Sequence, residues 1–107
     1  MAFKKSVGEM RKAWKLPKTL RILGRDVAVS LVAKGPMVAS QEYGEADLDD
    51  SEIRIGDWLC ESRARATLLH EVVHFIDDDL GLGMSEEQVA GVAQGLFQAL
   101  RDNERFI

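Results

Sequence analysis

Residues 62–80, SRARATLLHEVVHFIDDDL, are the segment around which the rest of this chain is organised. Apolar side chains fall at positions 68, 69, 72, 73, 76 and 80, which is the three- and four-residue spacing of a helix with one buried face. Gly81 and Gly83 follow directly, and glycine is common where a helix ends. The pattern predicts one long helix over this segment.

A second helix is predicted after the two glycines. Ser85 has a side chain that caps helices well, and Gln88, three residues later, completes a capping-box pattern. Its expected apolar face has helical spacing and consists of Val89, Val92, Ala93, Leu96, Phe97 and Leu100.

Upstream of the long helix, the sequence has the short patterns of β-strands. Residues 20–23 and 27–32 predict two strands joined by a tight turn at 24–26, and residues 43–46 and 53–55 predict two further short strands. Residues 6–14 predict a short helix that ends before Pro17. The expected order of a short helix, strands and two helices is that of an α+β domain.

The composition limits the class of protein. The chain has 107 residues, of which 46% are hydrophobic and 30% charged, so residues 1–107 are expected to form a single folded domain. It has no apolar run of about 18 residues that could cross a bilayer. Its one cysteine, Cys60, cannot form an internal disulfide, which favours the reducing cytoplasm, and we expect a buried structural thiol.

The charge is unevenly distributed. Residues 1–25 hold eight basic side chains against one acidic, a balance of +7, whereas the remainder of the chain carries −11 to give the net −4. A basic helical arm over residues 1–18 could contact nucleic acid or an acidic partner, although a solvated amphipathic segment is the simpler interpretation. The pI of about 5.1 argues against nucleic-acid binding as the main activity.

The segment His70-Glu71-Val72-Val73-His74 carries the chemistry, and it contains both histidines of the chain. On a helix, residues four apart lie on one face, so His70 and His74 can direct their imidazole nitrogens at one zinc ion. Glu71 can then act as general base on a water that the metal activates. On a helical wheel the histidines lie beside the apolar stripe, and Glu71 lies on the side away from it.

A catalytic zinc ion takes three protein ligands, and the chain has no third histidine. Glu86 is the first choice, because the wheel places it on the inward face of the second helix, where an unpaired carboxylate would be costly. Asp78 and Glu87 are the second choices. Asp77, on the histidine face, is expected to accept a hydrogen bond from the outer N–H of a ligand imidazole.

These motifs resemble the active-site region of small zincin-type metallopeptidases of phages and prophages. The likeness lies in residues 67–77, 81–89 and 100–103, with residues 43–45 and 53–55 similar to the upstream strands, and more distantly it extends to the ImmA/IrrE and SprT-like groups. It implies a minimal zincin fold, in which a small, mostly antiparallel sheet packs on the active-site helix and substrate lies along an edge strand. It also implies the ligands His70, His74 and Glu86, the base Glu71, and a place in the cytoplasm of a bacterial host.

The expected function is therefore that of a zinc-dependent metallopeptidase acting on a peptide or protein. In this hypothesis zinc polarises the carbonyl, while Glu71 takes a proton from water and passes it to the leaving amine. The alternative is a non-catalytic metal-binding regulatory module that engages a host protein or nucleic acid. No membrane partner is expected.

Overall fold

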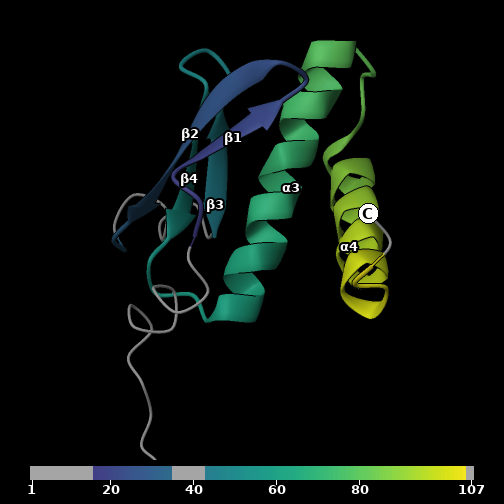
Figure 1. Cartoon of the computed structure of the whole chain (residues 1–107). Coiled ribbons are helices and arrows are strands. Elements are labelled where there is room, and N and C mark those ends of the chain that lie inside the picture. The colour runs from purple at the N-terminus through teal and green to yellow at the C-terminus, as the bar shows by residue number, and fades with distance from the viewer. Residues whose placement is uncertain (1–15, 35–42, 106–107) are drawn as a thin grey trace, which may run out of the picture.

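The computed structural model describes residues 16–34 and 43–105, which form a four-stranded sheet and two long helices (Figure 1). The helix predicted over residues 6–14 and most of the basic arm lie outside the described residues. The sequence and the structure agree on an α+β fold within this part of the chain.

The sheet begins with a hairpin. Strand β1 (Thr19–Ile22) pairs antiparallel with β2 (Arg25–Val32), with Ile22 opposite Arg25. Leu23 and Gly24 form the connection with φ of 51° and 81°, the left-handed backbone that two-residue hairpin turns require. The turn predicted at 24–26 is thus placed too late, since Arg25 already belongs to β2.

The complete sheet is mixed, with the strand order β1-β2-β4-β3. Strands β3 (Gly44–Asp47) and β4 (Glu52–Gly56) pair antiparallel, as β1 and β2 do, but the central pair, β2 and β4, is parallel. Two of the three pairings are antiparallel, in agreement with the expected mostly antiparallel sheet, and the parallel central pair was not expected. This topology leaves β3 at one edge of the sheet and β1 at the other.

The two predicted helices are confirmed as α3 (Glu61–Leu80) and α4 (Glu86–Asp102). Gly81 ends α3 in the left-handed conformation, with φ of 62°. Both bonds of the capping box are present at the start of α4, where Gln88 N donates to Ser85 Oγ at 3.1 Å and Ser85 N donates to Gln88 Oε1 at 2.9 Å. Neither helix has the length and apolar content needed to cross a bilayer.

The main core lies between the sheet and α3, which packs across one face of the sheet. Phe75 is fully buried there with β-strand side chains, whereas Leu80, predicted for the buried stripe, is exposed. The physical reason is that α3 has two neighbours on different sides. Phe75 packs against the sheet and Val73 packs against α4, so the buried surface of α3 is wider than a single stripe. Leu80, the last residue of α3, belongs to neither core.

Helix α4 lies against α3 on the side away from the sheet, so α3 is the middle layer of the molecule (Figure 1). A second small core joins the two helices through Val73, Val89 and Ala93. The predicted apolar face of α4 is only partly buried, because Val92 is 45% and Leu96 42% exposed. In the part of the chain that the structure describes, no other layer covers those side chains.

The prediction that Cys60 is a buried thiol is wrong, because its side chain is exposed. It is the residue just before α3 and has extended backbone angles there, so its side chain does not enter the core. Trp58, two residues earlier, is half-buried and packs against the main core.

Candidate metal centre

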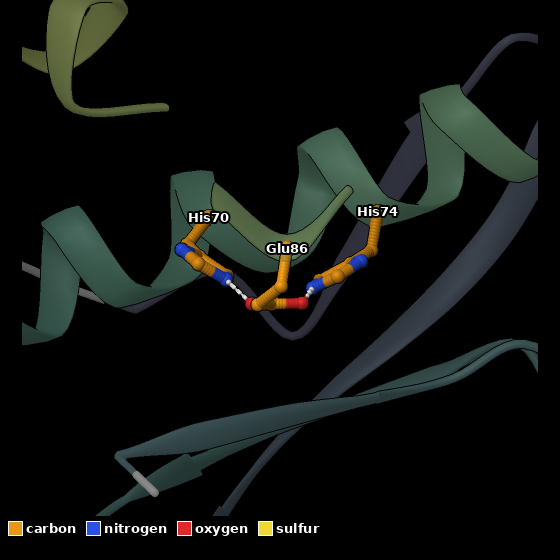
Figure 2. A group of neighbouring side chains, drawn as sticks. All are labelled: His70, His74 and Glu86. Carbon is orange, nitrogen blue, oxygen red and sulfur yellow. Dashed lines mark hydrogen bonds and ion pairs between the residues drawn. The ribbon is translucent and has the colours of Figure 1, made fainter. Parts of the chain in front are cut away.

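Three side chains converge from the two helices: His70 and His74 from α3 and Glu86 from the first turn of α4 (Figure 2). His70 Nε2 lies 2.9 Å from Glu86 Oε1, and His74 Nε2 lies 3.2 Å from Glu86 Oε2. All three candidate ligand atoms lie within 4.8 Å of one another. The structure thus brings together the two histidines and the first-choice third ligand.

The loop between the helices explains how Glu86 reaches the histidines. Gly81 and Gly83 both have positive φ, of 62° and 68°, and this lets the chain reverse within a few residues. Asp77 Oδ1 accepts a hydrogen bond of 3.0 Å from the backbone N–H of Met84, which fixes the returning segment to the end of α3. The Ser85 cap then starts α4 with Glu86 over the histidine face.

Glu86 lies in an open setting, because its side chain is 69% exposed, while those of His70 and His74 are 27% and 26% exposed. This corrects the expected burial of Glu86 in an apolar helix face. Partial desolvation raises the pKa of Glu86, but the hydrogen bond from His70 and the positive charge of His74 outweigh it, and the net pKa is lowered. The two imidazoles therefore favour the ionised form of the Glu86 carboxylate.

The donor set fits zinc. Two imidazole nitrogens and one carboxylate oxygen form a common ligand set of catalytic zinc sites. Bond lengths of about 2.0–2.2 Å in a tetrahedral arrangement separate neighbouring ligand atoms by roughly 3.3 Å. The contacts of 2.9 and 3.2 Å join the two imidazole nitrogens to different oxygens of Glu86, Oε1 and Oε2, and each is within a few tenths of an ångström of that separation.

Glu71 lies beside this group and lines the same hollow. The helical wheel placed it on the side away from the apolar stripe, but its side chain is only 6% exposed. The reason is that this side of α3 is covered by strand β3, whose residues form the facing wall of the hollow. Glu71 is thus a buried carboxylate that lines the same hollow as the two imidazoles.

The other acidic candidates lie elsewhere. Among the described residues, Asp78 and Glu87 do not belong to the cluster; Asp78 Oδ2 lies 4.0 Å from Arg25 Nη1, and Glu87 is exposed on α4. Asp77 accepts the Met84 N–H described above. Its predicted hydrogen bond to a ligand imidazole stays a prediction.

The cluster of His70, His74 and Glu86 lines a hollow of about 1050 Å³. Its walls are the edge strand β3 on one side and α4 on the other, and α3 forms its floor. Gly44 allows β3 to approach α3 closely, because a Cβ at this position would lie 2.6 Å from Thr67 Cγ2.

Sequence reasoning missed two residues that line this hollow, Arg63 and Arg101. A signal for Arg63 was present, because it precedes His70 by seven residues, or two helical turns, and so shares its face. Tyr43 also lines the hollow, and the centroid of its ring lies 4.9 Å from the Arg63 guanidinium carbon.

The cluster has the donor atoms to hold a divalent cation, and it lies beside a buried carboxylate in an open hollow. The histidines and Glu86 would hold the cation, and Glu71 would exchange protons with a molecule bound next to it. Comparisons of the chain with models of protein families, with curated proteins and with solved structures give no match.

Proposed function

We propose that this protein is a zinc-dependent metallopeptidase. The observation that carries the proposal is the convergence of His70, His74 and Glu86, with distances of 2.9 and 3.2 Å between the imidazole nitrogens and the carboxylate. Glu71, buried beside them in the same hollow, supplies the acid–base group that peptide hydrolysis requires.

Each residue has a distinct role in this proposal. A bound zinc ion would supply a Lewis acid that polarises the substrate carbonyl and makes water more acidic. His70, His74 and Glu86 would hold the ion from two helices, so the spacing between α3 and α4 would set how far the carboxylate lies from the imidazoles. Glu71 takes the proton from the attacking water and passes it to the leaving amine.

The edge strand favours a peptide over a small amide as substrate. Strand β3 pairs with β4 on one side, and in the described part of the chain no strand pairs with its other side. An extended peptide can hydrogen-bond to such an edge through its main chain. Residues 44–46 of β3 line the hollow, so a peptide bound there would pass the histidines.

Metal content and affinity test the ligand set. The purified protein should bind one zinc ion per chain, and His74→Ala should reduce the metal content to background. Glu86→Gln should weaken zinc binding and abolish hydrolysis, whereas Glu87→Gln, one residue along the same helix, is the matched control and should leave both unchanged. A His74→Ala variant with a full equivalent of zinc would refute the ligand assignment.

Glu71→Gln tests catalysis separately from metal binding. This variant should retain zinc and lose cleavage of an unfolded protein such as casein, measured by the release of new amino termini. Zinc binding by the wild-type protein without any cleavage would instead support a non-catalytic metal-binding module.

A further inference from the structure

The hollow has a positive end. Among the described residues that line it, the basic ones are Arg63, near the start of α3, and Arg101, near the end of α4. The two helices run in opposite directions, so these two helix ends lie at the same end of the helical pair (Figure 1). The metal ligands lie further along the hollow, toward the loop that joins the helices.

Of the three carboxylates that line the hollow, two are engaged away from the arginines, and the third, Glu71, is buried in α3. Glu45 accepts a hydrogen bond from Arg54 Nη1 at 2.5 Å, and Glu86 faces the histidines. The structure records no ion pair for Arg63 in the described part of the chain. Among the described residues, the only ion pair of Arg101 is a long contact of 3.6 Å between its Nε and Oδ1 of the exposed neighbour Asp102.

Both arginines are supported by aromatic rings of the hollow itself. The guanidinium carbon of Arg63 lies 4.9 Å from the ring centroid of Tyr43, and that of Arg101 lies 5.6 Å from the ring of Phe97. Such stacking holds a planar guanidinium in place while its edge N–H groups stay free to donate. The positive end is therefore partly preorganised for a carboxylate.

The spacing between this end and the metal ligands corresponds to a short stretch of peptide. Arg63 precedes His70 by seven residues, and the helical rise of 1.5 Å per residue gives about 10 Å between them along α3. An extended peptide advances about 3.3 Å per residue, so about three residues span that distance.

We propose that Arg63 and Arg101 select peptides that carry an aspartate or glutamate about three residues from the peptide bond held at His70 and His74. The peptide's carboxylate would complete the charge balance that the chain's own acids leave open at this end. This inference deepens the proposed peptidase function and rests on it for the position of the scissile bond, but acid selection can be measured without catalysis.

The test uses binding to the zinc-loaded Glu71→Gln protein, so that the probe is not cleaved. The probe is a rhodamine-labelled decapeptide of valine and serine with glutamates at the third and eighth positions, three residues to either side of its central bond. Its control twin has glutamines at both positions. Fluorescence anisotropy should show about fivefold tighter binding of the glutamate peptide at low ionic strength, and less in high salt.

Arg63→Gln and Arg101→Gln, each added to the Glu71→Gln protein, should each reduce this preference to about twofold, and the triple variant should abolish it. Arg65→Gln is the matched control, because Arg65 lies outside this hollow and pairs with Glu61 at 2.9 Å. Equal binding of the two peptides, no binding of either, or the same loss with Arg65→Gln would overturn the inference. Casein cleavage by the wild-type protein tests the peptidase proposal independently of these results.

Discussion

Replacing Gly44 with alanine is expected to destabilise the protein, because β3 passes too close to α3 for a side chain at this position. A Cβ there would lie 2.6 Å from Thr67 Cγ2, 3.0 Å from the Arg54 carbonyl oxygen and 3.3 Å from Ile55 Cδ1. The first of these distances is far inside van der Waals contact, so strand and helix must move apart. Overpacking of this kind costs about 1–3 kcal/mol in the free energy of unfolding.

A second substitution identifies the source of that cost. Thr67 is buried, and Thr67→Ser keeps its hydroxyl but removes the methyl group nearest to Gly44. Alone, this change should cost about 1 kcal/mol for the lost buried methyl group. In the Gly44→Ala background it removes the closest contact, so the double variant should be at least about 1 kcal/mol more stable than the sum of the single effects predicts.

Urea unfolding followed by far-UV circular dichroism measures the four stabilities of this cycle. Gly91→Ala is the control, because Gly91 lies inside α4 with no atom within 4 Å of an added Cβ. It should gain about 0.5–1 kcal/mol from the better helix propensity of alanine. A Gly44→Ala protein as stable as wild type, or strictly additive effects in the cycle, would refute the close approach of β3 to α3.

Two further predictions concern acidic residues. The pKa of Asp47 is lowered by its hydrogen bond from the Asp50 backbone N–H and by Arg54. Ionised Asp47 therefore stabilises the fold above pH 3.8, and this stabilisation is lost as the pH falls below that value. In urea unfolding at a series of pH values, Asp47→Asn should make the unfolding midpoint depend less on pH in this range. Asp77→Ala should weaken zinc affinity by about 10–100-fold in a competition titration while the fold stays intact. It also removes the acceptor for the Met84 N–H, and unchanged affinity would show that Asp77 serves only the loop.

The sequence predicts elements well where a local signal determines them. The capping box at Ser85, the glycine at the end of α3 and the four strand segments all depend on neighbouring residues, and all are confirmed. The parallel pairing of β2 with β4 depends on a long-range crossover, which no local pattern contains. The exposure of Val92 and Leu96 likewise depends on which layers lie against α4.

In the candidate site, too, local signals could be predicted and features that depend on long-range packing could not. The face shared by His70 and His74 comes from helical periodicity alone, and the position of Glu86 over it follows from a short loop and a cap. The burial of Glu71 could not be predicted, because it depends on β3 passing beside α3. The positive end of the hollow was also missed, since it requires Arg63 and Arg101 to be brought together by the antiparallel arrangement of the helices.

Because the core between the two helices is small, α4 is expected to detach from α3 by local unfolding before the whole protein unfolds. Helix α4 is held mainly by Val89 and Ala93 against Val73, whereas α3 is anchored to the sheet by a larger set of buried side chains. Local opening with so little apolar contact costs less than global unfolding. Detachment of α4 would carry Glu86 away and leave both histidines on an intact α3. A cation held by Glu86 and both histidines would therefore link α3 to α4 across a small core and oppose the detachment of α4.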